Sequence, residues 1–474
     1  MGCCQSRVES LPKSKDALDK SLLVFHSKGM PRDKYTTIKI LGKGGFGTVT
    51  LVEDKRTGTK RALKELHKSG LSKDDEQTML REVTTLSQID HPHIMKVFEL
   101  IESATSYNII TELIEGGELL EKITKEKKLS EKQAAKFMFE TMSAILYCHS
   151  KGIVHRDLKP QNLLLTSKDS ESSIKVIDFG IADKLNSRGK ITEVIGTPLF
   201  MSPEMFDGNY NEKCDIWSSG VILFMMITGT VPFSGNGIAQ IKESIKAAKI
   251  DYTRPVWSTV SSDVQDLIKK MIDPNPSRRL SAEQVIKHPW FAAYKAGSLS
   301  DNPISEEAFE NLSKFHATNK LQKSILTFIS TNIMDEESNK ELTKLFKSID
   351  KNNDGRLSHE EIINGYKELG LPASQAEEII KKVDSDQSGI IEYSEFITAT
   401  QNWRNVCEKD VLEKTFKIYD MGGDGNLSLQ ELKTLIPGIE NSEWEQFIND
   451  ADKNRDGLIS LTEFKEYMLT KIGN

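Results

Sequence analysis

Residues 155–162 of this chain, His-Arg-Asp-Leu-Lys-Pro-Gln-Asn, place an acid, a cation and an amide within one short loop. Asp157 can accept the proton of an incoming hydroxyl, Lys159 can neutralise charge on a moving phosphate, and Asn162 can hold Mg²⁺ through its amide oxygen. Phosphoryl transfer needs this set of groups, because it depends mainly on positioning and electrostatics. The alternative interpretation is an ordinary exposed loop of mixed charge, and the segments around it decide between the two.

The same stretch matches the catalytic loop of protein kinases, and its Lys159-Pro160 form resembles the serine/threonine branch. Residues 174–180 follow as a strand that ends in Asp-Phe-Gly, whose Asp178 is the expected second Mg²⁺ ligand. Upstream, residues 42–49 form a glycine-rich hairpin whose backbone amides can approach nucleotide phosphates. A dinucleotide-binding fold is the usual rival, but a second strand follows the glycines here, where that fold has a helix.

Three more segments complete the resemblance to a nucleotide site. Lys64 ends a strand of small and apolar residues, and Glu82 lies on an amphipathic helix. In kinases such a lysine and glutamate form an ion pair that activity requires. Without Lys64, Glu82 would be taken for a solvated helix residue. Residues 107–119 resemble the hinge, in which backbone groups of Glu112 and Ile114 contact adenine. The ATP site implied by the resemblance consists of Leu41, Gly42, Lys43, Gly44, Gly45, Phe46, Gly47, Val49, Ala62, Lys64, Glu82, Thr111, Glu112, Ile114 and Glu118.

Within that site, Thr111 occupies the gatekeeper position and predicts a modest pocket behind the adenine. By resemblance, Glu118 lies near the ribose and the substrate and favours a basic residue a few positions before the target hydroxyl. Gln161 replaces a glutamate that is common in kinases preferring basic substrates, which puts a second arginine requirement in doubt.

The segment after Asp178 resembles the kinase activation segment. Thr197 resembles the threonine that hydrogen-bonds the catalytic aspartate and lysine. Arg156 is, in related enzymes, often neutralised by a phosphate on this segment; here Glu193 could stand in for the phosphate, or Thr192 could be phosphorylated.

Four further positions carry structural features of the kinase family. Glu204 is expected to pair with Arg279, and Ser202 stands where kinases usually carry alanine. Asp215 begins the core helix, a structural position.

The last third of the chain repeats a calcium-loop pattern. Residues 350–361 place oxygen ligands at positions 1, 3, 5 and 9 and a glutamate at position 12, while Gly355 allows the sharp turn. The frame recurs from Asp384, Asp420 and Asp452, which reads as two EF-hand pairs; Asp-rich surface turns would not repeat as four helix-loop-helix frames. The expected ligands, including position-7 backbone carbonyls, are Asp350, Asn352, Asp354, Arg356 and Glu361; Asp384, Asp386, Ser388, Ile390 and Glu395; Asp420, Asp424, Asn426 and Glu431; and Asp452, Asn454, Asp456, Leu458 and Glu463.

Two details refine this prediction. The third loop has Gly422 at position 3 and so lacks one side-chain ligand, which predicts weak or absent calcium binding there. Position 8 is apolar in every loop and can join the loops in short ribbons, through Leu357, Ile391, Leu427 and Ile459.

Between the two patterns lies a joint, residues 292–337. Its helix carries an apolar stripe with lysines among it, which resembles a calmodulin-target helix, although a plain linker helix would show the same periodicity. Its position favours an autoinhibitory switch. The stripe consists of Leu312, Phe315, Leu321, Ile325, Phe328 and Ile329.

The first residues, Met-Gly-Cys-Cys-Gln-Ser, fit a myristoylation signal at Gly2, with Cys3 and Cys4 as candidates for palmitoylation. Two lipid signals together give stable anchoring, whereas one myristoyl chain binds reversibly. A chance start containing Gly and Ser is the alternative.

Composition sets wider limits. A length of 474 residues suggests about three domains. The fractions of 38% hydrophobic and 28% charged residues are those of a soluble globular chain, and a net charge of −7 gives no pull toward nucleic acid. Residues 221–227, the longest apolar run, are far short of the ~20 that a membrane span needs, and no secretory signal is visible. Five cysteines without paired or metal-ligand spacing suit a reducing compartment.

The arrangement resembles the calcium-dependent protein kinases of plants and protists. This implies a lipid-anchor segment over 1–34, an α+β bilobal serine/threonine kinase domain over 35–291, an autoinhibitory junction over 292–337, and an all-α calmodulin-like domain with two EF-hand pairs over 338–474. ATP, Mg²⁺ and Ca²⁺ are the implied cofactors. The implied catalytic residues are Asp157, Lys159, Asn162 and Asp178, with Asn162 and Asp178 binding Mg²⁺.

The implied activity is transfer of the ATP γ-phosphate to protein Ser/Thr hydroxyls, blocked by the junction and EF-hand domain until calcium binds. We expect a monomer on the cytoplasmic face of a membrane, the plasma membrane by preference, that acts on substrates with basic residues and not on nucleic acid. A membrane-tethered sensor with an inactive kinase lobe is one alternative, but the full catalytic set speaks against it. A constitutively active kinase with structural EF-hands is the other, and three complete loops disfavour it.

Overall fold

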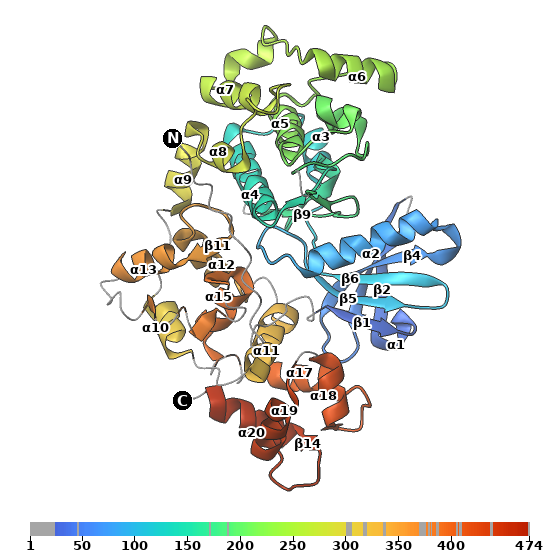
Figure 1. The fold of residues 1–474 in the computed structure, drawn as a ribbon, viewed down its shortest axis with the longest axis vertical. Coiled ribbons are helices and arrows are strands. Elements are labelled where there is room, and N and C mark those ends of the chain that lie inside the picture. Colours follow the sequence, from blue (N-terminus) through green and yellow to red (C-terminus); the bar gives the residue numbers. More distant parts are fainter. Residues whose placement is uncertain are drawn as a thin grey trace. The chain divides into compact units, whose positions relative to one another are not determined.

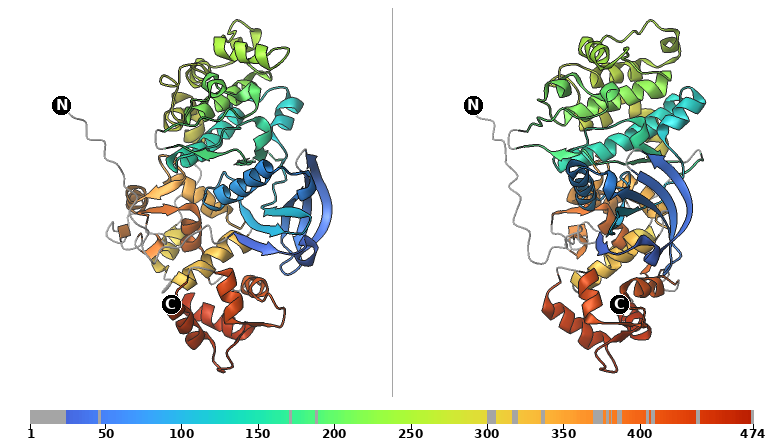
Figure 2. Two further views of the ribbon diagram at one scale, coloured as in Figure 1. Left: turned by 45° about the vertical axis from the view of Figure 1, so that its right-hand side comes forward. Right: turned by 90° about the vertical axis from the view of Figure 1, so that its right-hand side faces the viewer.

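The computed structural model describes residues 24–472, except 45–46, 170–171, 187–188, 300–305, 316–319, 335–337, 369–375, 378–379, 381, 385–387, 404–405, 407–409 and 437–438. The chain forms two compact units (Figures 1 and 2). The two-lobed unit contains the described residues up to 299 together with Thr343–Arg356, and the helical unit contains Glu306–Leu342 and the residues from Leu357 onward. The predicted lipidation sites Gly2, Cys3 and Cys4 lie outside the described residues.

The small lobe is a twisted six-stranded sheet with the order β1-β5-β6-β4-β3-β2 (Figure 1). All its pairs are antiparallel except β1 with β5. Helix α2 (Lys73–Ser87) starts at Ser72, whose hydroxyl accepts the Asp75 amide, and it buries Met79, Val83 and Leu86. The strands are β1 (Phe25–Lys28), β2 (Tyr35–Gly44), β3 (Gly47–Asp54), β4 (Lys60–His67), β5 (Val97–Glu102) and β6 (Ser106–Thr111).

Strand β1 and the short helix α1 (Pro31–Lys34) come from the segment that the sequence assigned to the lipid anchor. They surround Glu99 of β5, a buried carboxylate that needs partners. The Ser27 hydroxyl donates to Glu99 at 2.7 Å and the Tyr35 hydroxyl at 3.0 Å, and the Lys34 ammonium lies against the same carboxylate. Residues 24–34 are therefore part of the small lobe, because they supply the hydrogen bonds that Glu99 requires.

The large lobe is built around α4 (Glu131–Ser150) and α5 (Lys213–Thr228). Helix α5 is buried along nearly its whole length, as expected for a helix that is apolar on all sides, and its Trp217 stacks on Phe233 at 5.5 Å. The other helices are α3 (Leu119–Glu126), α6 (Ile238–Ala247), α7 (Ser262–Met271), α8 (Ala282–Ile286) and α9 (Ala292–Leu299). Short 3-10 helices cover Lys68–Gly70, Pro160–Asn162, Pro198–Phe200, Pro203–Asp207, Pro255–Thr259 and Pro289–Phe291.

Two small antiparallel ribbons flank the predicted catalytic loop. Strand β8 (Leu163–Leu165) pairs with β9 (Ile174–Val176), and β7 (Ile153–Val154) pairs with β10 (Asp183–Lys184). The catalytic loop thus begins at the end of β7 and runs into β8, while the Asp-Phe-Gly segment follows β9.

The expected EF-hand frames are confirmed, and the segment Thr343–Arg356 of the two-lobed unit belongs to the first of them. The ribbons form as predicted: β11 (Arg356–Ser358) pairs with β12 (Ile390–Glu392), and in the pair β13 (Asn426–Leu427) and β14 (Ile459–Ser460), Leu427 lies opposite Ile459. The flanking helices are α12 (Lys340–Ile349), α13 (His359–Glu368), α15 (Tyr393–Thr400), α17 (Val411–Tyr419), α18 (Leu429–Leu435), α19 (Asn441–Ala451) and α20 (Leu461–Ile472).

In the described part of the junction, α9 lies in the two-lobed unit and two further α-helices lie in the helical unit, where the sequence suggested a single helix. Helix α10 (Glu306–Lys314) packs on α15, and α11 (Lys320–Phe328) packs on α15 and α19 before a π-helical turn, Ile329–Ile333. The whole predicted stripe is buried. The Phe328 ring lies 5.2 Å from the Tyr419 ring, and the Phe309 ring lies 4.8 Å from that of Tyr366. The EF-hand helices therefore cover the junction's apolar face.

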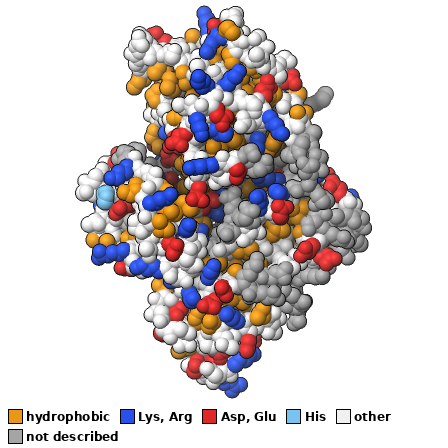
Figure 3. All heavy atoms as spheres, turned by 180° about the vertical axis from the view of Figure 1, so that it is seen from behind, with side chains coloured by type: hydrophobic (Ala, Val, Ile, Leu, Met, Phe, Trp, Pro, Cys, Tyr) orange, Lys and Arg blue, Asp and Glu red, His pale blue; other side chains and the backbone are white. Residues whose placement is uncertain are grey.

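Charges of both signs alternate over the face drawn in Figure 3, where basic and acidic side chains lie among apolar ones. In the part of the chain that the structure describes, no helix has the length and apolar character needed to cross a membrane.

Candidate active site and calcium loops

One buried carboxylate anchors the start of the catalytic loop by hydrogen bonds. Asp215, at the start of α5, accepts the backbone amides of His155 and Arg156, each at 2.9 Å, and the His149 Nε2 group lies 2.9 Å from it. Burial alone would raise the pKa of Asp215, but the bond to His149 and the charges around it outweigh burial, so the pKa is lowered. Arg156 is held at a φ of 72°, a left-handed conformation that these hydrogen bonds stabilise.

Three side chains orient Asp157, and of these contacts the resemblance predicted the hydrogen bond from Thr197. Its Oδ1 accepts the Thr197 hydroxyl at 2.6 Å and the Thr197 amide at 3.1 Å, and its Oδ2 accepts the Lys159 ammonium at 2.5 Å. Asn162 donates to the Asp157 backbone oxygen at 2.9 Å. A carboxylate fixed in this way keeps one geometry, as a group that accepts a substrate proton must.

The two neighbours of Asp178 in the chain hold it beside the catalytic loop. The Ile177 amide donates to the Asn162 carbonyl at 3.0 Å, and the Phe179 ring packs on His155 with ring centres 4.7 Å apart. Asp178 itself has a φ of 65°. The two predicted Mg²⁺ ligands thus come from segments that are hydrogen-bonded to each other, and their oxygens suit a hard cation.

The ion pair predicted between Lys64 and Glu82 is formed. The Lys64 ammonium lies 3.1 Å from one Glu82 oxygen and 3.4 Å from the other. Burial opposes the charge on Lys64, but Glu82 and Asp178 outweigh it and raise the pKa of Lys64, so it stays protonated. Lys64 therefore connects α2 with the Asp178 segment electrostatically.

The glycine-rich hairpin (β2 and β3) and the strand before the hinge (β6) lie on either side of β4 in the sheet. Val49 lies opposite Lys64 and Ala62 lies opposite Thr111, so these residues of the predicted ATP site share adjacent strands. Gly47 has a φ of 151°, and a Cβ there would lie 1.8 Å from the Glu65 carbonyl oxygen, so no other residue fits. The remaining hairpin positions Leu41, Gly42, Lys43 and Gly44 form the end of β2, while Gly45 and Phe46 lie outside the described residues.

One side-chain hydrogen bond and one backbone hydrogen bond hold the hinge. The Thr111 hydroxyl donates to the Glu112 carbonyl at 3.2 Å, and beyond Ile114 the Gly116 amide donates to the Leu165 carbonyl at 2.8 Å. Glu118 precedes α3; its burial, followed by the nearby Glu121, raises its pKa.

Arg156 is fully buried and faces two acids. Its guanidinium lies 3.0 Å from Glu193, the predicted stand-in for a phosphate, and 3.7 Å from Asp183. The Tyr210 hydroxyl lies 3.4 Å away. Asp183 was not among the residues predicted from the sequence, where its place shortly after the Asp-Phe-Gly segment is the only signal for this role.

The end of the segment is fixed as the resemblance implied. Arg279, which is buried, binds both oxygens of Glu204 at 2.5 and 3.0 Å. The Ser202 side chain is buried and its hydroxyl has no hydrogen-bond partner.

The calcium loops show the backbone geometry of the predicted frame. Each position-6 glycine has a φ between 76° and 84°, and its amide donates to the first aspartate at 2.7–2.9 Å. In the third loop the Gly422 amide donates to Glu431 at 2.8 Å. Asp386 lies outside the described residues. The hydrogen bonds from the position-6 glycine to the first aspartate join Gly355 to Asp350, Gly389 to Asp384, Gly425 to Asp420 and Gly457 to Asp452.

The oxygen-rich donor set fits Ca²⁺. The position-12 glutamates bind amides near the loop end: Glu361 accepts the Ser358 amide and Glu463 the Ser460 amide, each at 2.9 Å. Among the described residues, accordingly, no three acidic, His or Cys side chains gather into a preformed metal cluster.

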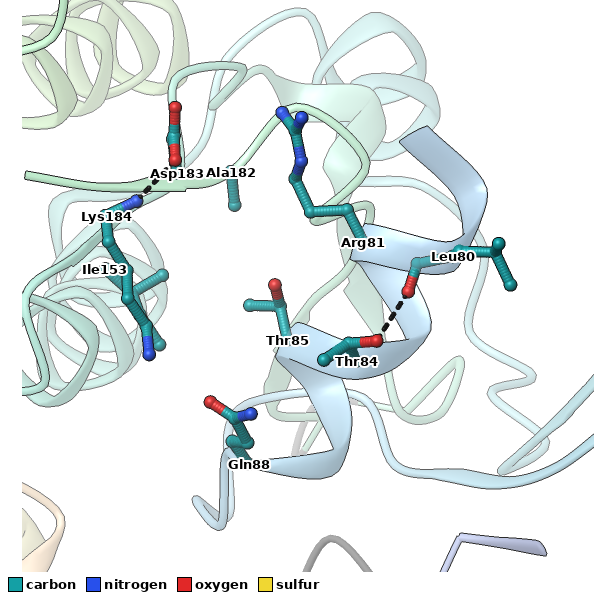
Figure 4. A pocket seen from close by; sticks show the side chains of 9 residues that line it. All are labelled: Leu80, Arg81, Thr84, Thr85, Gln88, Ile153, Ala182, Asp183 and Lys184. Carbon is teal, nitrogen blue, oxygen red and sulfur yellow. Dashed lines mark hydrogen bonds between the residues drawn. The ribbon is translucent and has the colours of Figure 1, made fainter. Parts of the chain in front are cut away.

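A cavity of about 370 Å³ lies outside these sites (Figure 4). Its walls are α2 and the β7-β10 ribbon, and it contains none of the predicted site residues.

A two-lobed fold with this catalytic loop, ion pair and metal-ligand segment defines a protein kinase. The model of the protein kinase domain matches residues 35–291, and that of the EF-hand domain pair matches residues 339–401 and 409–469. Calcium-dependent protein kinase 4 of Plasmodium falciparum is 36% identical over 476 residues, covering 96% of this chain and 90% of the relative. Calcium-dependent protein kinase 33 of Arabidopsis thaliana is 33% identical over 437 residues, covering 91% and 83%.

The chain belongs to the calcium-dependent protein kinases. It is a calcium-activated serine/threonine protein kinase that uses ATP, Mg²⁺ and Ca²⁺. The expected family, fold class and enzyme activity are confirmed, whereas the roles of individual site residues, the lipid anchor and the domain boundaries stay predictions.

Proposed function

We propose that Asp157, Lys159, Asn162 and Asp178 carry the phosphoryl transfer of this kinase. The orientation of Asp157 by Thr197 and Lys159 is the observation that supports this most strongly. Asp157 accepts the proton of the protein Ser or Thr hydroxyl, and Lys159 balances charge on the transferred group. Asn162 and Asp178 would hold Mg²⁺, which supplies charge neutralisation at the ATP phosphates.

The first test is peptide phosphorylation by the purified full-length chain with Mg·ATP, in calcium and in excess chelator. Asp157→Asn is the blank and is expected to lose about 10²–10⁴-fold in kcat, the range for a general base. Retention of activity by this variant would contradict the assignment of Asp157.

We further propose that the junction is the switch. Its apolar face is covered by the EF-hand helices, through Phe309 against Tyr366 and Phe328 against Tyr419. Without calcium the EF-hand helices close and release this face, which is then free to block the kinase, since calcium opens sensor EF-hand pairs.

Ile325→Asp tests this, because a carboxylate at this buried position opposes capture by the EF-hand helices. We expect the variant to stay near the chelator level of activity even in calcium, while Thr434→Asp, at an exposed position of α18 beyond the third calcium loop, responds normally. Equal activity of the wild type in both buffers would instead favour structural EF-hands and a constitutively active kinase.

We propose that Gly2 is myristoylated and that Cys3 or Cys4 is palmitoylated, which anchors the kinase at the cytoplasmic face of a membrane. Support comes from the motif alone. Gly2→Ala is expected to move the protein into the soluble fraction, and membrane retention of that variant would contradict the proposal.

We propose a monomer that prefers protein substrates with a basic residue before the target hydroxyl, and that does not act on nucleic acid. Glu118 supports this substrate preference, since its carboxylate lies at the start of α3 beside the hinge. A peptide pair that differs only by Arg or Gln at the third position before the serine tests it: equal KM values would contradict it.

A further inference from the structure

A buried ion pair joins the hinge to the strand that leads to Asp178. The Lys175 ammonium lies 3.1 Å from one Glu112 oxygen and 3.2 Å from the other, and the two side chains are only 6% and 14% exposed. Glu112 is the first residue after β6, where the hinge begins, and Lys175 is the middle residue of β9. The pair therefore links the adenine side of the predicted site to its metal side.

Each partner is fixed to a common third segment. The Glu112 carboxylate accepts the Lys96 amide at 2.7 Å, and the Glu112 amide donates to the Lys96 carbonyl at 3.1 Å. On the other side, the Val176 amide donates to the His93 carbonyl at 2.8 Å, and the Met95 amide donates to the Val176 carbonyl at 3.0 Å. The ion pair closes a frame made of the hinge, β9 and the residues 93–96 that precede β5.

Stability alone does not explain this pair. Removing two opposite charges from water costs about as much as their attraction returns, so apolar residues of similar volume would stabilise the fold equally well. An ion pair with fixed hydrogen bonds instead specifies one geometry. The Glu112 amide and carboxylate both bond to Lys96, and the carboxylate also binds Lys175, so these contacts fix the Cα of Glu112 and with it the start of the carbonyl that the Thr111 hydroxyl contacts.

We propose that Lys175 and the Glu112 side chain are positioning residues that hold the hinge backbone at a fixed distance from the strand carrying Asp178. The inference rests on the proposed contact of adenine with the hinge. Transfer requires the nucleotide base and the metal-bound phosphates to be held together in one alignment. Neither side chain touches a reacting atom; both act through the hinge backbone and β9.

The experiment uses the full-length kinase in calcium, with Lys175→Met, Lys175→Arg, Glu112→Gln and the Lys175→Met/Glu112→Gln double variant. The KM for ATP and kcat are measured with saturating peptide. The inhibition constant of adenosine is measured against ATP, because adenosine reports the hinge contact without the phosphates. Lys122→Met breaks an ion pair with Glu126 at 2.8 Å on the more exposed helix α3 and serves as the matched control.

We expect Lys175→Met to raise the KM for ATP and the inhibition constant of adenosine together, by roughly tenfold, with a smaller fall in kcat. Lys175→Arg should retain most of the affinity. The double variant should be no worse than the poorer single variant, since residues acting as a unit are not additive. Lys122→Met should leave all three constants unchanged.

Values within twofold of wild type for Lys175→Met, with only a lowered unfolding temperature, would overturn the inference and leave a stabilising role. Should that variant fail to fold, Glu112→Gln, which keeps shape and removes charge, decides by the same two constants. If adenosine does not compete with ATP in the wild type, the proposed adenine contact itself is wrong, a result distinct from the first.

Discussion

The contact between Arg156 and Glu193 predicts that this kinase needs no phosphate on its activation segment. The Arg156 guanidinium is fully buried and must be balanced, and Glu193 is its nearest carboxylate at 3.0 Å. Replacing Glu193 by Gln removes the charge and keeps the shape. The ordered segment holds Thr197 against Asp157, so loosening it should lower activity.

The magnitude follows from the exposure of the two side chains. A fully buried pair that loses one partner costs about 3–5 kcal/mol, and an exposed pair is worth about 0–1 kcal/mol. Glu193 is 57% exposed, so solvent screens it, and Asp183 at 3.7 Å keeps part of the balance. We therefore expect about 1–1.5 kcal/mol, which corresponds to a roughly five- to tenfold fall in kcat/KM.

The assay is peptide phosphorylation in calcium by protein treated with phosphatase, with mass spectrometry to establish that Thr192 carries no phosphate. Glu283→Gln is the control, because Glu283 is similarly exposed at 59% and pairs with Lys287 at 2.6 Å. Adding Asp183→Asn to Glu193→Gln should lower activity further. An unchanged Glu193→Gln variant, or a wild type inactive until Thr192 is phosphorylated, would refute the reasoning.

Three other predictions follow from single positions. Ser202→Ala should stabilise the kinase by about 1 kcal/mol in chemical denaturation, because it removes a buried hydroxyl without a partner, and a loss of stability would contradict this. Burial and Glu121 raise the pKa of Glu118, so on acidification this carboxylate loses its charge at a higher pH than usual. The KM for a basic peptide should therefore rise as the pH falls through that pKa. Glu118→Gln should give a flatter dependence of this KM on pH. Gly422→Asp should tighten calcium binding at the third loop by roughly tenfold in calorimetric titration, since it adds a charged ligand, and four equally tight wild-type sites would count against it.

The sequence alone determined the fold class, the order of the kinase segments and the four EF-hand frames. These depend on short motifs in which a few neighbouring residues fix both the backbone and the chemistry, such as residues 155–162 and the glycine at position 6 of each calcium loop. The sequence also predicted the ion pairs Lys64–Glu82 and Glu204–Arg279, because each partner lies in a recognisable motif.

Tertiary structure alone decided the contacts between residues without a motif. Residues 24–34 join the small lobe because the buried Glu99 carboxylate requires their hydroxyl and ammonium groups as partners. No local sequence pattern predicts these contacts. Asp183 faces Arg156, and Lys175 faces Glu112, only because loops and strands distant in sequence meet in the fold. The apolar periodicity of the junction predicted a buried face; which helices cover it depends on long-range packing, which a periodic pattern does not encode.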